Sequence, residues 1–233
     1  MVKLPGSIHL KNPNQDRDIL TFGKPQEVAD RDLHEGVARF GGFLRHPSYA
    51  HAYFKSAKIL LENAKLKNEL DEFGLPIFYL ARHTIELKLK GLLEMAYDIF
   101  VMRYQLYPDM NPSEILPSKN QLERLVNSHN LDKLYRDLKQ SCSKLNIEIP
   151  EKQFIDVISI INQYEVNPTW SRYSKSKDGL HVNEEIELPI VQILNYLEIL
   201  FKTVSYDQES EDEKLESELN SIYTSLTSKM ESS

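Results

Sequence analysis

The sequence contains one cysteine, few glycines and no long apolar run, and each scarcity excludes a class of protein. The single Cys142 cannot form an internal disulfide, which is typical of a protein kept in a reducing compartment. Eight glycines and 11 prolines are too few for a collagen-like or low-complexity chain. The sequence contains no run of roughly 18 apolar residues, the length that a membrane-spanning helix needs. Residues 1–15 also lack the apolar segment of a secretory signal. We therefore expect a cytoplasmic protein without membrane association.

The composition that is present suits one large domain, or one domain with a tail. Hydrophobic residues make up 41% of the 27.1 kDa chain and charged residues 27%, which is enough for a packed core. The net charge of −7 is concentrated at one end, because residues 206–233 carry eight acidic side chains against two lysines, a net charge of −6. The tail should repel phosphate. The rest of the chain has a net charge of only about −1, which does not argue against binding to nucleic acid.

Apolar residues at helical spacing predict an all-α fold: an antiparallel bundle of five or six helices with a long central helix and a short acidic C-terminal amphipathic helix. The clearest stripe steps by three and four along the central helix, which we expect to start near Pro76 and to end near Tyr104. Its apolar residues are Phe78, Ala81, Ile85, Leu89, Leu92, Ala96 and Ile99. Ser118 is predicted to cap a shorter helix, and Pro189 to precede the last helix of the bundle. No segment alternates as a strand does.

Three regions follow from these patterns. Residues 1–47 form an irregular N-terminal extension with a weak helical pattern at 25–40, and residues 48–205 form the helical bundle. Residues 206–233 form the acidic tail, in which apolar residues spaced by four, three and four predict the amphipathic helix: Leu215, Leu219, Ile222 and Leu226.

Familiar catalytic signatures are missing. There is no Walker loop, GxGxxG, HExxH or CxxC motif, so we expect no cofactor and no metal site. Cys142 has no clear histidine partner and is expected to be a core residue.

The long helix also has a polar face, on which Arg82, Glu86 and Lys90 recur every four residues, with Tyr79 and His83 beside them. One interpretation is a row of salt bridges on a solvent-exposed flank, the usual meaning of such a charge run. The other is that Glu86 is half-buried and orients a partner across the bundle.

Three segments of the chain share a resemblance to one family: residues 78–93 (FYLARHTIELKLKGLL), residues 128–135 (SHNLDKLY), and Tyr164 followed by residues 170–173 (WSRY). Together they resemble the HEPN (higher eukaryotes and prokaryotes nucleotide-binding) domain family. The first segment is similar to its core helix, the second to its histidine turn into the next helix, and the third to its tyrosine and Arg-Tyr-Pro loop, with Ser174 in place of the proline. The segments occur in the family's order and span roughly residues 48–205.

The resemblance implies RNA or nucleotide binding, and many members are metal-independent endoribonucleases of toxin–antitoxin and antiphage defence systems. Their signature is an arginine, four to six residues and a histidine, which hold the scissile phosphate and move protons. Two such pairs typically meet across a homodimer cleft. This sequence matches the signature incompletely. Three arginine–histidine pairs come near it. Arg124 and His129 have the right spacing, but the apolar Leu125 follows the arginine, where the family usually has a polar residue. Arg39 and His46 lie in the irregular extension, and Arg172 and His181 are separated by eight residues.

We therefore predict Arg172, His129 and His181 as catalytic residues, with Arg172, His129 and Glu86 converging on one ligand. The predicted ligand-binding residues are Trp170, Tyr173, Lys175, Lys177, Glu86 and His83. In residues 170–177 two aromatics alternate with cations, which suits base stacking and phosphate contact; alternatively, the aromatics anchor the loop and the lysines are simply solvated.

Two functions remain open from the sequence. The first is an RNA- or nucleotide-binding HEPN-like effector, with or without ribonuclease activity. The second is a non-catalytic helical interaction subunit that dimerises or docks on an enzyme partner encoded by a neighbouring gene. Both readings predict a homodimer or a hetero-complex, because the helical stripes and the amphipathic tail offer apolar surface to bury.

Overall fold

The computed structural model describes residues 26–38, 49–165, 175–176, 179–180, 185–205 and 214–232. They belong to two compact units, residues 1–49 and residues 50–233. In the first unit the described residues form helix α1 (Gln26–Glu35), within the range where the sequence showed a weak helical pattern.

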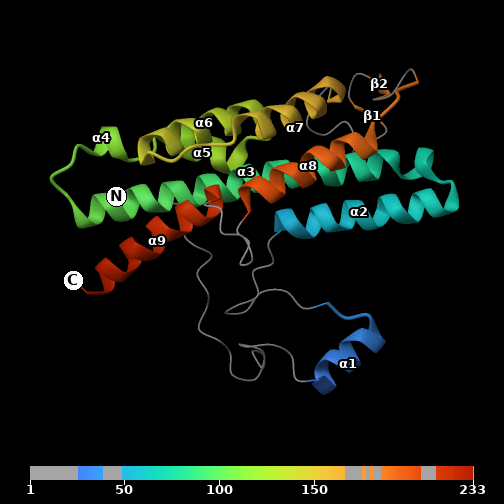
Figure 1. Cartoon of the computed structure of the whole chain (residues 1–233), viewed down its shortest axis with the longest axis horizontal. Coiled ribbons are helices and arrows are strands. Elements are labelled where there is room, and N and C mark those ends of the chain that lie inside the picture. Colours follow the sequence, from blue (N-terminus) through green and yellow to red (C-terminus); the bar gives the residue numbers. More distant parts are fainter. Residues whose placement is uncertain are drawn as a thin grey trace. The chain divides into compact units, whose positions relative to one another are not determined.

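The described residues of the second unit are mostly helical, which confirms the predicted all-α class (Figure 1). Its helices are α2 (Tyr49–Lys67), α3 (Leu70–Leu106), α4 (Pro112–Ile115), α5 (Lys119–Asn127), α6 (Leu131–Leu145), α7 (Glu151–Tyr164), α8 (Ile190–Val204) and α9 (Leu215–Glu231). Two short strands, β1 (Lys175–Ser176) and β2 (Gly179–Leu180), pair antiparallel. The sequence did not predict them, because two residues are too few to show an alternating pattern.

Helix α3 is the central helix, 37 residues long, and the apolar stripe predicted for it lies wholly in the core. Its start differs from the prediction, since α3 begins at Leu70 and contains Pro76 in its interior. The preceding turn sets this start: Asn68 has a left-handed φ of 61° and ends α2, and the Glu69 amide donates to the Ala64 carbonyl at 2.9 Å. The packing of the long apolar face outweighs the cost of an internal proline, which is about 3 kcal/mol.

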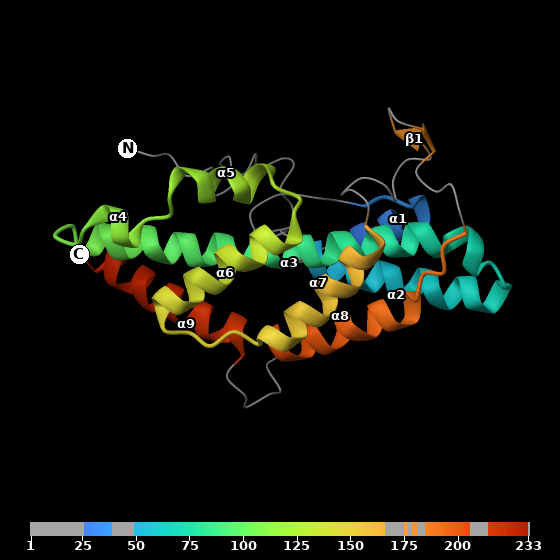
Figure 2. The same ribbon diagram turned by 90° about the horizontal axis from the view of Figure 1, so that it is seen from above.

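Helices α6, α8 and α9 pack against α3, and α7 packs against α8. In Figures 1 and 2, α6 and α9 lie along the C-terminal half of α3, whereas α2 lies along its N-terminal half. The stripe predicted for the last bundle helix is buried in α8: Ile190, Ile193, Leu194, Leu197, Leu200, Phe201 and Val204.

The acidic tail contains the predicted amphipathic helix, α9, and this helix is docked rather than solvated. Leu215, Leu219 and Leu226 are buried in the core shared with α3. Buried Lys88 of α3 reinforces the contact, since its ammonium donates to Glu216 of α9 and to Ser205, each at 2.9 Å. The regularly spaced leucines predicted from the sequence are thus the residues through which α9 packs on the core.

Two side-chain contacts hold the connection from α5 to α6 in place. Ser118 and Gln121 form a reciprocal capping box at the start of α5, as the predicted cap required. Arg124 of α5 donates two hydrogen bonds of 2.7 Å to the buried carboxylate of Asp137 in α6. These contacts fix the turn at residues 128–130, which carries His129.

Among the described residues no helix is both long enough and apolar enough to cross a membrane.

Candidate functional site

Glu86 lies on the polar face of α3 but is only 2% exposed, so the interpretation of a solvent-exposed flank is wrong. Its carboxylate is surrounded by cationic and polar partners. Oε1 accepts from the Lys90 ammonium at 3.0 Å and contacts the His129 ring, while Oε2 accepts from the Arg82 guanidinium. The second interpretation, a carboxylate that orients a group across the bundle, describes the geometry.

The group that Glu86 orients is His129. The Nδ1 atom of His129 lies 2.9 Å from Glu86 Oε1, and the side chain is 49% exposed. His129 precedes α6 by two residues, and the side chain of Asn130 caps that helix. With Nδ1 committed to a buried carboxylate, Nε2 is the ring nitrogen left for a ligand.

Arg82 ties this pair to two other parts of the chain. Besides Glu86, its guanidinium donates to the backbone carbonyl of His129 and, through Nε at 2.7 Å, to Glu165 Oε1. Glu165 directly follows α7, so one buried arginine joins α3, the turn before α6 and the end of α7. We call Arg82, Glu86, Lys90, His129 and Glu165 the Glu86 cluster.

The charges of the Glu86 cluster hold Glu86 in its ionised form. Burial alone would raise the pKa of this carboxyl group. The hydrogen bond from Lys90, the charge of Arg82 and the hydrogen bond with His129 outweigh burial and lower the pKa from 4.5 to about 2. Glu86 is therefore an anion at neutral pH and serves to position His129, not to exchange protons.

A small group of aromatic rings lies one turn earlier on α3. The ring of His83 stacks on Tyr79 with centroids 5.7 Å apart and an interplanar angle of 8°. Tyr53 of α2 meets His83 edge-on, with centroids 4.6 Å apart. All three side chains are partly exposed, so the rings combine packing of α2 on α3 with an accessible aromatic surface.

Among the sequence-predicted site residues, the structure brings Glu86 and His129 into contact and places His83 on the neighbouring turn of the same helix. Lys175 lies in β1, and only its backbone is described. The other predicted site residues lie outside the described residues: Arg172, His181, Trp170, Tyr173 and Lys177.

The structure describes only one of the two other candidate arginine–histidine pairs, Arg124 and His129. Arg39 and His46 lie outside the described residues. Arg124 has the spacing to His129 that the family signature requires. Its guanidinium, however, donates to Asp137, so Arg124 has a structural role in the α5–α6 connection. Cys142 is fully buried, as expected of a core residue, and burial, followed by the charge of Glu218, raises the pKa of its thiol to about 12.

Sequence reasoning missed three members of this region. Arg82 was recognised only as one charge of a helical row, because nothing in its spacing shows that it reaches two distant segments. Glu165 and Tyr53 belong to no pattern that indicates a site. The feature of the sequence that pointed to the Glu86 cluster was the row of charged residues on an otherwise apolar helix.

A scan against protein-family models and searches of curated proteins and of solved structures found no match for this chain. Within the described part of the chain no group of three or more His, Cys, Asp or Glu side chains is arranged to hold a metal ion.

Proposed function

We propose that the chain is a HEPN-like RNA-binding protein and a metal-independent endoribonuclease in which His129 transfers the proton. One observation carries the proposal: a half-exposed histidine ring held through Nδ1 by a buried, ionised carboxylate. Such a carboxylate accepts the hydrogen of Nδ1 and fixes the orientation of the ring, so that Nε2 is the nitrogen turned to a substrate.

The chemistry follows from this arrangement. Nε2 of His129 removes the proton from a ribose 2′-hydroxyl, and the oxygen forms a bond to the adjacent phosphorus. The bond from phosphorus to the 5′-oxygen breaks, leaving a 2′,3′-cyclic phosphate, and the departing oxygen takes a proton from water or from a second acid, the role we assign to His181. Arg172 is assigned as the phosphate clamp, because a guanidinium suits the charge that develops on the phosphoryl oxygens.

The contacts of Arg82 support the proposal. The three segments that resemble the HEPN family lie far apart in the sequence, yet Arg82 of the first donates to the His129 carbonyl of the second and to Glu165, next to Tyr164 of the third. Arg172 follows Glu165 by seven residues, a span of at most about 25 Å in a fully extended chain. The clamp we assign is thus tethered to the Glu86 cluster by a short connection.

The rings of Tyr79, His83 and Tyr53 supply a surface on which a base can stack, one turn of α3 away from Glu86. Stacking of this kind contributes about 1–3 kcal/mol per base and tolerates different base identities. We therefore expect binding to single-stranded RNA with little sequence preference.

The test is cleavage of a fluorescently labelled single-stranded RNA by the full chain in excess EDTA, with the product ends identified. We expect 2′,3′-cyclic phosphate ends, and we expect His129→Ala to reduce the rate by at least about 100-fold, the range for loss of a proton-transferring group. His34→Ala is the matched control, since His34 is an exposed histidine of α1. Circular dichroism checks that both variants keep the wild-type helicity.

Retention of wild-type cleavage by the His129→Ala variant would reject the role of His129. Absence of both cleavage and binding of the same RNA at low ionic strength, measured by fluorescence anisotropy, would reject the proposed function altogether.

A further inference from the structure

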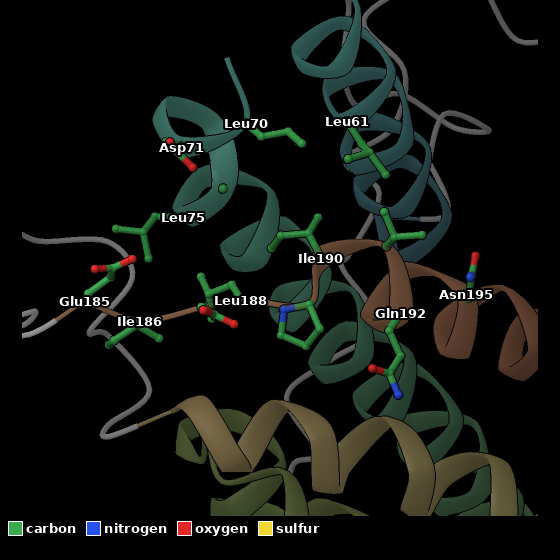
Figure 3. A pocket seen from close by; sticks show the side chains of 14 residues that line it. Leu61, Leu70, Asp71, Leu75, Glu185, Ile186, Leu188, Ile190, Gln192 and Asn195 are labelled. Atoms are coloured by element: carbon green, nitrogen blue, oxygen red, sulfur yellow. The ribbon is translucent and has the colours of Figure 1, made fainter. Parts of the chain in front are cut away.

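A hollow of about 980 Å³ opens where α2, the start of α3 and the segment leading into α8 meet (Figure 3). We call it the α2–α3–α8 groove. Its floor is apolar, because Leu61 of α2, Leu75 of α3 and Ile190 of α8 all line the same space. Three further apolar lining residues are exposed to solvent: Leu70 at 40%, Ile186 at 40% and Val191 at 44%. Exposed apolar side chains gathered around one hollow are typical of a binding site.

Among the described residues that line the groove, the charged side chains are all acidic. They are Asp71 of α3 and Glu185 and Glu187 of the segment before α8, and all three are exposed. None of the three forms an ion pair with another described residue. Figure 3 shows Asp71 and Glu185 at one end of the groove and the amides of Gln192 and Asn195 at the other. These three side chains, the groove carboxylates, should repel phosphate and attract a cation.

A glycine leaves room in the groove. Gly74 lies inside α3, where glycine is less favourable than alanine, and it lines the groove. A Cβ atom at this position would meet nothing within 4 Å. A side chain at residue 74 would therefore extend into the hollow, so the glycine keeps the groove open.

We propose that the α2–α3–α8 groove binds a small amphipathic amine, with its apolar body on the leucine-lined floor and its ammonium group beside the groove carboxylates. The volume of the groove lies in the range of small-molecule sites, about 300–1,000 Å³. The apolar floor argues against a fully hydrated ion as the ligand, and the groove carboxylates argue against a nucleotide or another anion. An ammonium group pairs with the carboxylates, and an apolar body removes the exposed leucine, isoleucine and valine side chains from water.

This site goes beyond the proposed ribonuclease activity. No member of the Glu86 cluster is among the residues that line the groove. Binding of an amine is therefore measured without RNA, and its outcome does not depend on whether the chain cleaves RNA.

The probe is dansylcadaverine, in which a short alkyl chain joins an apolar fluorescent ring system to a primary ammonium group. The full chain is titrated with the probe up to about 1 mM, and binding is followed by the rise in fluorescence that an apolar environment causes. We expect saturable binding at one site per chain. The neutral analogue N-butyl dansylamide should bind at least about fivefold more weakly, because it lacks the ammonium group.

Filling the groove tests the location. Gly74→Phe should raise the Kd for dansylcadaverine at least about tenfold, because the phenyl ring occupies the hollow. Gly91→Phe is the matched control, since a Cβ at Gly91 of α3 also meets nothing within 4 Å and Gly91 does not line the groove. Circular dichroism checks that both variants keep the wild-type helicity.

Removing charge tests the role of the carboxylates. Asp71→Asn/Glu185→Gln should weaken binding of dansylcadaverine at least about fivefold and leave binding of the neutral analogue unchanged. Asp109→Asn/Glu123→Gln removes two charges from exposed residues that do not line the groove, and it should change neither affinity. All four side chains are exposed, so the fold should survive.

Three results would overturn the proposal. Absence of saturable dansylcadaverine binding would leave the groove to a protein segment rather than a small amine. Equal affinity for the charged and the neutral probe would show that the groove carboxylates do not select the ligand. Binding that survives Gly74→Phe would place the amine outside the groove.

Discussion

Replacing Glu86 by glutamine should destabilise the fold in a way that depends on pH. The substitution keeps the size and hydrogen-bonding shape of the side chain but removes the charge that compensates Arg82 and Lys90. Glu86 is 2% exposed, so solvent screens the interaction weakly. The effect should therefore be much larger than that of a surface salt bridge, which is below about 1 kcal/mol.

The magnitude follows from linkage between proton binding and folding. A pKa that falls from 4.5 in the unfolded chain to about 2 in the folded protein corresponds to about 3 kcal/mol of stability when Glu86 is ionised. Because the folded pKa is the lower one, this stabilisation is complete above the unfolded value and is lost as the pH falls towards the folded value. About 2 kcal/mol of it should already be lost at pH 3.

The assay is urea unfolding of wild type and Glu86→Gln, followed by circular dichroism at 222 nm between pH 7 and pH 3. The difference in unfolding free energy should be about 3 kcal/mol at pH 7 and about 1 kcal/mol at pH 3. Glu123→Gln, an exposed glutamate of α5, is the control and should shift stability by less than about 0.5 kcal/mol. A pH-independent difference, or one below about 1 kcal/mol at pH 7, would refute the assignment of Glu86 as a buried anion.

Two further predictions concern the tail helix and the single thiol. Leu219→Ala on α9 should lower the unfolding free energy by about 2–4 kcal/mol and speed proteolysis of residues 214–232, whereas Ser225→Ala on the exposed side should not; equal effects would show that α9 is not docked through Leu219. Burial and the raised pKa of Cys142 should make its alkylation by iodoacetamide at pH 8 at least about 100-fold slower in the native protein than in guanidinium chloride; fast native labelling would contradict its core position.

Local patterns were sufficient to predict the long helix α3, the last bundle helix α8 and the tail helix α9, but not the helix count: five or six were expected, and the described residues 49–232 form eight, among them the four-residue α4. The apolar residues of α3 and α8 recur with the period of a helix, so each helix has one apolar face that must be buried against its neighbours. The cap at Ser118 and the amphipathic tail were predicted for the same reason, since both depend on residues within one or two turns of each other. The start of α3 was not predicted, because packing along the whole helix outweighed the local effect of Pro76.

The sequence by itself determined which residue types were available to the Glu86 cluster, and that three of them, Arg82, Glu86 and Lys90, lie on one helical face. Only the tertiary structure decided that Glu86 is buried, that His129 is its partner 43 residues away, and that Arg82 reaches Glu165, 83 residues away. Helical periodicity relates residues within a few turns, whereas contacts between separate helices depend on how those helices pack. The ionisation of Glu86 follows from that packing, because burial penalises its charge and only the cations gathered by the fold reverse the penalty.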